Sequence, residues 1–520
     1  MGSCLLMLVW LIELFNNGCI ISHEANHRNP SKYRVKERNY YIFVKRCRNM
    51  RNAGELVEPR LGLFEGLMKV SEFWITGTTI IDIINNVVVM TNGDIERLGK
   101  RIGTSNTVSS DDLEMLQKYR ETFQIPISHV FNFILDAARK IDKSSIVTFR
   151  IKRIDTIVEK LHRFYQDPNG KMKLSRMWDI AGCRCIMHSP DSEKLYQLLE
   201  VIENEYGPDI KIKDSVEESK PSGYRSLHVY VKDKQTQKHV EIQIRNVEQH
   251  NWATLVEIVD LLYGTKNKEY GAYNTLGRFL YLYSHASDLE EEDFVEMLRI
   301  ERRMKIFEMM SNVLTGNYLN IRRQWLKQKQ RGCYFVITAN KGGSEIISFQ
   351  SFDDAETAYY EKYLTNRDSN IVLTHLKMPD LEQISMAYSN YVLAMHAFLD
   401  DYRILVSKRM IQWLREGAYY KFMKYSRFYN SNVKCHFENL CIETNVLESC
   451  MNDPEIPRHQ LMKWLKEIKQ RLQLWSKETN DLFYSFAREI KGRRIIKWLV
   501  MSRARRLAKA VSEGQRSLRK

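Results

Sequence analysis

The sequence predicts an α+β fold in which β-strands are flanked by helices. Three observations support this prediction: two segments alternate polar and apolar residues with a period of two, the segments around them have helical spacing, and the composition is that of a folded protein. Hydrophobic residues make up 44% of the chain and charged residues 28%. With 520 residues, the chain is long enough for more than one domain.

The two alternating segments each carry an unusual polar row. In the second segment, the polar face holds His239, Glu241, Gln243 and Arg245, and the apolar face holds Val240, Ile242 and Ile244. In the first segment, Tyr224, Ser226 and His228 lie opposite Leu227, Val229 and Val231. The simpler explanation of these polar rows is a sheet face that is exposed to solvent. An aromatic ring, a histidine and a carboxylate aligned on one face favour a functional site.

A basic segment over residues 148–167 predicts an amphipathic helix. Its apolar residues recur at helical spacing and are Ile151, Ile154, Ile157, Val158 and Leu161. Its polar side carries a stripe formed by Arg153, Thr156, Lys160 and Arg163, with Arg150 and Lys152 nearby. A solvated helix face would explain this pattern, but fixed cations of this kind also bind polyphosphates.

The next segment, RMWDIAGCRCIMH, predicts a strand that enters the core. Asp179 stands at its start, Arg184 lies within it, and Cys183 and Cys185 fall on one face, where ordinary packing explains them. Asp179 is either a functional carboxylate or the cap of a turn.

Several further segments have predictable structure. Ser109 or Ser110 is expected to cap a helix that is interrupted near Pro126, and residues 246–264 predict another helix. Residues 333–404 predict a small α+β module with a hairpin turn at 341–343.

The N-terminal segments contain no motif that indicates a catalytic or binding function. The apolar segment 4–15 is too short to span a bilayer, so we expect a buried helix or a wrongly chosen start codon. Residues 76–90 are rich in β-forming residues and predict a strand pair.

Charge and cysteine usage point to the partners and the compartment. The net charge is +15, and residues 491–520 hold eleven Lys or Arg against the single acid Glu513. Such an excess favours binding of polyanions, including nucleotides and RNA. The nine cysteines include no CxxC pair, so we expect a reducing cytoplasm and no membrane anchor.

Four segments in this order, FRIKRIDTIVEKL, DIAGCRCI, KPSGYRSLH and VEIQIRNVEQHNWATLVE, resemble the RelA/SpoT nucleotide-pyrophosphokinase domain. YFVITAN, AETAYYEKY and ISMAYSNYV are similar to the longer members, which carry an extra α+β module. The resemblance implies a nucleotidyltransferase-like synthetase domain over residues 101–290, with a mixed β-sheet flanked by helices. An N-terminal extension (1–100), a helical linker with the small module (291–404) and a helical, basic C-terminal region (405–520) surround it.

The resemblance also implies roles for single residues. Arg150 would stack on or clamp the adenine of ATP, and the phosphates would be held by Lys152, Arg153 and Lys160. Asp179 and Glu241 would be the catalytic carboxylates: Asp179 would bind Mg²⁺, and Glu241 would complete the metal site or accept the 3′-hydroxyl proton. The acceptor nucleotide would be bound by Lys220, Tyr224, His228, Gln243 and Arg245.

The implied enzyme is a GTP diphosphokinase that transfers pyrophosphate from ATP to the 3′-hydroxyl of GDP or GTP and makes (p)ppGpp-type alarmones of the stringent response. The chain contains no HD dipeptide, so a synthetase without the hydrolase activity is expected. Ser222 and Asn246 depart from the family pattern on the acceptor side, which leaves the acceptor open. The alternatives are pyrophosphate transfer to the 3′ end of tRNA, recruited by the basic C-terminal region, and an inactive nucleotide sensor. An oligomer is compatible with each of them.

Overall fold

The computed structural model describes residues 90–509, apart from gaps at 168–172, 272, 287, 329–330, 341–342, 367–369, 393–395, 491–493, 496, 503–504 and 507–508. The apolar segment 4–15 lies outside the described residues, as does the β-rich segment 76–90 except for its last residue. Their predicted structures therefore stay predictions.

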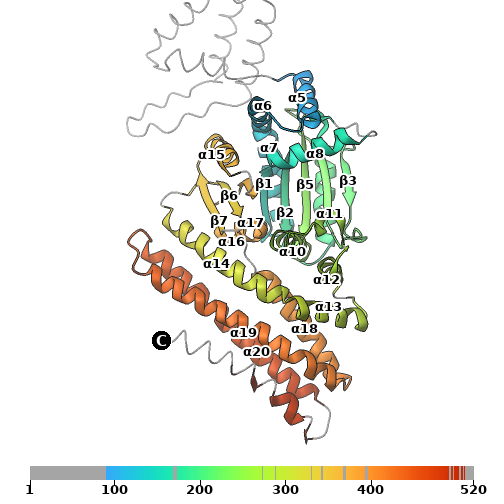
Figure 1. Ribbon diagram of the computed structural model, residues 1–520, viewed down its shortest axis with the longest axis vertical. Coiled ribbons are helices and arrows are strands. Elements are labelled where there is room, and N and C mark those ends of the chain that lie inside the picture. The colour runs from blue at the N-terminus through green and yellow to red at the C-terminus, as the bar shows by residue number, and fades with distance from the viewer. Residues whose placement is uncertain are drawn as a thin grey trace, which may run out of the picture. The chain divides into compact units, whose positions relative to one another are not determined.

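An eight-stranded mixed sheet forms the centre of the described chain (Figure 1). Its strands are β1 (Ile146–Ile151), β2 (Ala181–Met187), β3 (Lys211–Asp214), β4 (Leu227–Lys232), β5 (His239–Asn246), β6 (Tyr334–Asn340), β7 (Gly343–Phe349) and β8 (Asn370–His375). The strand order is β3-β4-β5-β2-β1-β8-β6-β7. β2 and β5 are parallel, and the other neighbouring pairs are antiparallel. The α+β prediction is confirmed.

The helices before and between the first strands are α5 (Asn92–Thr104), α6 (Ser110–Glu121), α7 (Gln124–Ile141), α8 (Ile154–Gln166), the 3₁₀ turn η1 (Leu174–Arg176) and α9 (Glu193–Tyr206). The helices after β5 are α10 (Val247–Tyr263), α11 (Asn267–Tyr270), α12 (Thr275–Ser284), α13 (Glu291–Met304) and α14 (Ile306–Lys327). The C-terminal helices are α15 (Phe352–Thr365), α16 (Leu381–Ala387), α17 (Ser389–Val392), α18 (His396–Arg415), α19 (Tyr419–Cys450) and α20 (Arg458–Glu489).

The two faces of the sheet are covered by different helices. On one face, α7 and α9 pack against the apolar rows of the strands, where Phe131 of α7 meets the edge of Phe149 at 5.5 Å between ring centroids. On the other face, α10 packs against β2 and β5, and α16 and α17 pack against β1, β6, β7 and β8. The polar rows lie on this second face, so α10 and α16–α17 border them.

Local signals in the sequence set several of these elements. The Ser109 side chain accepts a hydrogen bond from the Asp112 amide and begins α6, as predicted. The predicted interruption is the break between α6 and α7, and Pro126 lies in the first turn of α7, where its missing N–H costs nothing. α10 begins with a capping box formed by Asn246 and Gln249.

The helix predicted over residues 148–167 is wrong in its first part. Residues 146–151 form β1, and α8 begins only at Ile154, with Arg153 as its N-cap residue. Ile151 is buried in the sheet and does not lie on the helix face. The apolar residues of a strand and of the helix that follows can share helical spacing, so the pattern does not mark their boundary.

In the segment 333–404, β6 and β7 pair as an antiparallel hairpin, whose predicted turn includes residues 341 and 342 outside the described residues. These strands and β8 extend the central sheet. β8 pairs with β1 and with β6, and α15 packs beside β6 and β8. This arrangement brings residues near 370–391 next to the strand that carries Arg150.

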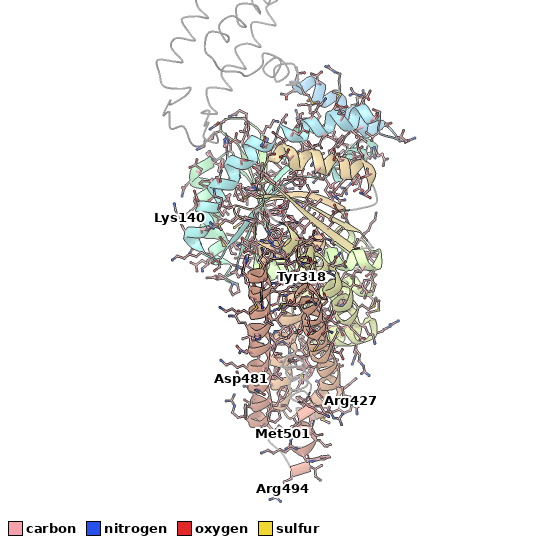
Figure 2. All side chains as sticks on the ribbon, turned by 90° about the vertical axis from the view of Figure 1, so that its left-hand side faces the viewer. Lys140, Tyr318, Arg427, Asp481, Arg494 and Met501 are labelled. Atoms are coloured by element: carbon pink, nitrogen blue, oxygen red, sulfur yellow. The ribbon has the colours of Figure 1, made fainter. Side chains whose placement is uncertain are left out.

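The described part of the C-terminal region is helical. α18, α19 and α20 pack on one another, and α14 packs along α19. Figure 2 shows the side chains of these helices, with the exposed residues Arg427 and Asp481 labelled. Among the described helices, none is both long and apolar enough to cross a membrane.

Candidate active site

Sheet register brings the polar residues of four strands into two adjacent rows. One row runs across β1, β2, β5 and β4 through Arg150, Gly182, Glu241 and Tyr230. The next row runs through Thr148, Arg184, Gln243 and His228. Paired residues of neighbouring strands point to the same face, so these side chains share the face bordered by α10 and α16–α17.

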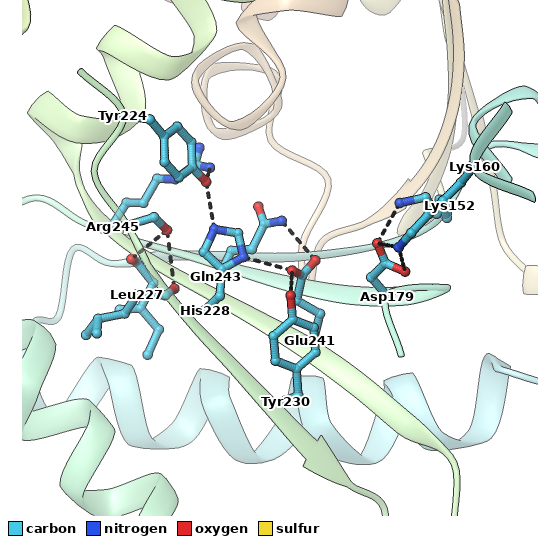
Figure 3. Close-up of polar contacts among 12 residues, drawn as sticks. Lys152, Lys160, Asp179, Tyr224, Leu227, His228, Tyr230, Glu241, Gln243 and Arg245 are labelled. Atoms are coloured by element: carbon cyan, nitrogen blue, oxygen red, sulfur yellow. Dashed lines mark hydrogen bonds and ion pairs between the residues drawn. The ribbon is translucent and has the colours of Figure 1, made fainter. Parts of the chain in front are cut away.

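Asp179 lies in the turn two residues before β2 and forms two ion pairs (Figure 3). Lys152 Nζ lies 2.8 Å from Asp179 Oδ2, and Lys160 Nζ lies 2.8 Å from both carboxylate oxygens. Burial alone would raise the pKa of Asp179, but attraction to the two lysines outweighs it and lowers this pKa. The carboxylate is therefore ionised and lies among fixed cations.

Packing and backbone contacts hold Asp179 in place. The preceding Trp178 stacks on His239 at the start of β5, with 4.3 Å between ring centroids. The amide of Lys152 donates to the Ile180 carbonyl at 2.7 Å. The residues on either side of Asp179 are thus anchored, Trp178 to β5 and Ile180 to Lys152, the residue that follows β1.

Glu241 is buried on β5 and accepts hydrogen bonds from three side chains. His228 Nδ1 and the Tyr230 hydroxyl lie 2.8 Å and 3.0 Å from Oε1, and Gln243 Nε2 lies 3.0 Å from Oε2. Burial would raise the pKa of Glu241, but the bond and charge of His228, followed by Gln243 and Tyr230, hold it well below its usual range. Glu241 is therefore a permanent anion at neutral pH.

A chain of hydrogen bonds continues from Glu241 to Arg245 (Figure 3). The Tyr224 hydroxyl lies 2.7 Å from His228 Nε2 and accepts a hydrogen bond from Arg245 Nη2. Burial opposes ionisation of Tyr224, but Arg245 and His228 lower its pKa to about 7. Burial likewise opposes the charged form of His228, but the bond to Glu241 raises its pKa. Tyr224 and His228 thus contact each other, as expected, but Tyr224 lies in the loop before β4 and not in the predicted strand.

The loop before β4 presents Lys220 and Tyr224 together. The Lys220 amide donates a hydrogen bond to the Tyr224 carbonyl at 3.0 Å, and Lys220 Nζ lies 4.9 Å from the centroid of the Tyr224 ring. Arg245 Cζ lies at the same distance of 4.9 Å from this centroid. Gly223 has a positive φ of 90°, and an added Cβ would lie 2.2 Å from Ser284 Oγ, so the tight turn requires glycine.

Arg150 and Arg153 occupy different elements. Arg150 lies on β1 in the row of Glu241, and Arg153 lies at the corner between β1 and α8, where its Nη1 donates to Asn370 Oδ1. Arg163, the last member of the predicted stripe, is exposed in the last turn of α8. Arg150 and Arg153 therefore lie at the sheet, whereas Arg163 is exposed to solvent.

Two residues on this face did not enter the predicted site. Tyr230 donates to Glu241, and burial followed by the charges of Glu241 and Asp179 raises its pKa, so it stays protonated. Arg184 is buried on β2, with its guanidinium 5.2 Å from the Tyr388 ring, and burial followed by repulsion from Arg150 lowers its pKa to about 10. Strand alternation could have placed both residues on the polar face, because Tyr230 is two residues after His228 and Arg184 points away from its neighbour Cys183.

The comparisons with known proteins cover this part of the chain. Residues 149–268 match the family described as the region found in RelA / SpoT proteins. GTP pyrophosphokinase YwaC of Bacillus subtilis is 32% identical over 113 residues, which is 20% of this chain and 53% of that protein. An uncharacterized protein of Mycobacterium tuberculosis is 31% identical over 119 residues, which is 23% of this chain and 41% of that protein. The chain thus spans about half, or less, of the curated relatives it matches.

Solved structures give similar matches. The small alarmone synthetase 1 of Bacillus subtilis bound to its product pppGpp has 24% identity and a TM-score of 0.26, over 35% of this chain and 96% of that chain. A GTP pyrophosphokinase family protein of Streptococcus pneumoniae has 20% identity and a TM-score of 0.26, over 38% of this chain and 98% of that chain. From the sequence match, this chain contains a RelA/SpoT-type synthetase domain.

Proposed function

We propose that this protein transfers pyrophosphate from ATP to the 3′-hydroxyl of a guanosine nucleotide, GDP or GTP, and makes a (p)ppGpp-type product without the hydrolase activity. One observation carries the proposal. Every residue expected to act in this reaction lies within the matched region 149–268, and the fold presents both ionised carboxylates and their cationic neighbours around one polar sheet face. Phosphoryl transfer depends mainly on positioning and charge neutralisation, which such a face supplies.

The reaction would displace AMP from ATP. The acceptor 3′-oxygen bonds to the β-phosphorus, the bond from this phosphorus to the oxygen of the α-phosphate breaks so that AMP leaves with the bonding electrons, and the 3′-hydroxyl proton passes to solvent water. Lys152 and Lys160 would bind the ATP phosphates in exchange for part of their pairing with Asp179. Arg150 would contact the adenine, and Arg153 would add a further contact to the phosphates.

The acceptor would bind on the side of Tyr224. Lys220 already lies over the Tyr224 ring, and Arg245 lies close to the same ring. A base that stacks on Tyr224 would replace the Lys220 ammonium, which would then be available for an acceptor phosphate. Base stacking of this kind contributes about 1–3 kcal/mol.

The residues fit a Mg²⁺ ion in type and charge. Magnesium in phosphoryl-transfer sites is bound by one or two carboxylates together with substrate phosphates and water. Asp179 and Glu241 are such carboxylates, and both charges act on the Tyr230 hydroxyl. Among the described residues, no three His, Cys, Asp or Glu side chains converge as a preformed metal site. A bound ion would supply charge neutralisation at the transferred phosphates.

The low pKa of Glu241 bears on its role. A general base works best with a pKa near the operating pH, whereas Glu241 is held as a stable anion by three hydrogen bonds. We therefore assign Glu241 to charge stabilisation and the orientation of His228, in preference to proton abstraction.

The test is product analysis with ATP labelled on its terminal phosphates. The purified full chain is incubated with Mg²⁺ and with GDP, GTP, ATP or total tRNA as separate acceptors. The proposal predicts label on GDP or GTP, and loss of this label in the variants Asp179→Asn and Glu241→Gln. Label on tRNA alone, or no transfer to any acceptor, would contradict it.

A further inference from the structure

The corner between β1 and α8 is held by residues from far along the chain. Arg120 Nε of α6 donates to the Lys152 carbonyl at 2.9 Å, and this guanidinium pairs with Glu356 of α15 at 3.2 Å. The Ile154 amide donates to the Tyr359 hydroxyl of α15 at 3.1 Å. These contacts fix the backbone on either side of Arg153.

The Arg153 side chain has separate partners. Its Nη1 donates to Asn370 Oδ1 at the start of β8, and its guanidinium also interacts with the Tyr391 hydroxyl of α17. Within the described chain, Arg153 Nε is buried and has no hydrogen-bond partner. The guanidinium is thus oriented by two neutral acceptors and keeps Nε as an unpaired donor, while the Asp155 carboxylate also acts on its charge.

Asn370 and Tyr391 lie outside residues 149–268, the region shared with the family. The segment that carries Tyr391 is itself anchored. The Tyr388 hydroxyl lies 2.7 Å from Thr374 Oγ1, and the His250 ring bonds to the Met386 carbonyl at 2.8 Å. A fixed segment that contacts a cation of the donor side is suited to position that cation.

We propose that Asn370 and Tyr391 are positioning residues for the donor nucleotide, which hold the Arg153 guanidinium toward the phosphates of ATP. The extension formed by β8 and α16–α17 is thereby part of the donor site. This inference rests on the proposed function, since it takes ATP as the donor. Neutral acceptors suit this task because they orient the guanidinium without cancelling its charge.

The test is a double-mutant cycle between Asn370→Ala and Arg153→Ala. If Asn370 acts through Arg153, Asn370→Ala raises KM for ATP roughly tenfold, as expected when a hydrogen bond to a charged group is lost. The KM for the acceptor stays unchanged. In the Arg153→Ala chain, the same substitution has no further effect, because neighbouring residues that act together are not additive.

Two more variants separate positioning from folding. Tyr391→Phe removes only the hydroxyl and is expected to raise KM for ATP in the same direction. Tyr425→Phe is the matched control, because this buried tyrosine of α19 has a hydroxyl without a hydrogen-bond partner among the described residues. It leaves KM for ATP unchanged. Unfolding midpoints are measured for all variants, and KM values are compared only among the variants that stay folded.

Binding of a non-hydrolysable ATP analogue, measured by calorimetry, repeats the comparison without turnover. The inference is supported if Asn370→Ala weakens binding of the analogue and the double variant binds it no more weakly than Arg153→Ala does. Suppose that the unmodified chain binds the analogue. An unchanged or lower Kd in Asn370→Ala then overturns this inference alone. So does a loss of affinity from Asn370→Ala that is equally large with Arg153 present and with Arg153→Ala. An unmodified chain that neither binds ATP nor transfers pyrophosphate overturns the proposed function as well.

Discussion

Replacing Tyr224 with phenylalanine removes the hydroxyl that joins Arg245 to His228. This hydroxyl accepts from Arg245 Nη2 and lies 2.7 Å from His228 Nε2, so two hydrogen bonds that involve cationic or basic groups are lost. Arg245 Nε has no hydrogen-bond partner among the described residues, so the substitution leaves this buried guanidinium with fewer partners still. At about 1.5–3 kcal/mol for a hydrogen bond to a charged group, we expect a loss of about 3 kcal/mol in the free energy of unfolding.

The same substitution changes how stability depends on pH. The pKa of Tyr224 is lowered from 10.0 to about 7 in the folded protein. Its contribution to stability is therefore complete above about pH 10 and is lost as the pH falls to about 7. This shift corresponds to about 4 kcal/mol, because a tenfold change in proton affinity is about 1.4 kcal/mol. The advantage of the unmodified chain over Tyr224→Phe should thus grow as the pH rises through this range.

The assay is denaturant unfolding of both chains at a series of pH values, together with the ultraviolet absorbance of phenolate. The unmodified chain should show one phenolate that forms near neutral pH and that is missing in Tyr224→Phe. A stability difference that is flat or that shrinks with rising pH, together with identical phenolate titrations, would refute the reasoning about Arg245 and His228.

Two further substitutions test other parts of the site. Asp179→Asn removes the charge that pairs with Lys152 and Lys160, so we expect pyrophosphate transfer to fall at least about 1,000-fold, while nucleotide binding, measured by calorimetry, persists. Transfer at the original rate would remove Asp179 from the site. Gly223→Ala places a Cβ 2.2 Å from Ser284 Oγ at a positive φ, so we expect a loss of about 2 kcal/mol in thermal or denaturant unfolding and a raised KM for the acceptor. An unchanged KM would show that this turn does not set the acceptor contacts.

Much of the candidate site follows from short-range patterns in the sequence. Strand alternation predicts that Tyr224 and His228 share a face and that Glu241 and Gln243 do so on β5. Tyr224 lies in the loop before β4, but the register of β4 and β5 pairs His228 with Gln243. The period of two is a local property of an extended chain, so it survives without knowledge of the fold. Whether each of these residues binds substrate stays a prediction.

The remaining features depend on contacts that no local pattern contains. The spacing of Ile151, Ile154 and Ile157 does not reveal that a strand ends and a helix begins between the first two. Likewise, the pairing of β8 with β1 brings Asn370 to Arg153 across a long stretch of sequence. Such pairings are determined by the packing of the whole sheet, and a single sequence does not encode them in a readable period.

The most direct test of the account is the stoichiometry of the leaving group in the presence of Mg²⁺, ATP and GDP or GTP. Pyrophosphate transfer predicts one AMP released for each nucleotide that gains a 3′-pyrophosphate, with both products absent in Glu241→Gln. Release of ADP in place of AMP, or AMP without a pyrophosphorylated nucleotide, would contradict the assignment.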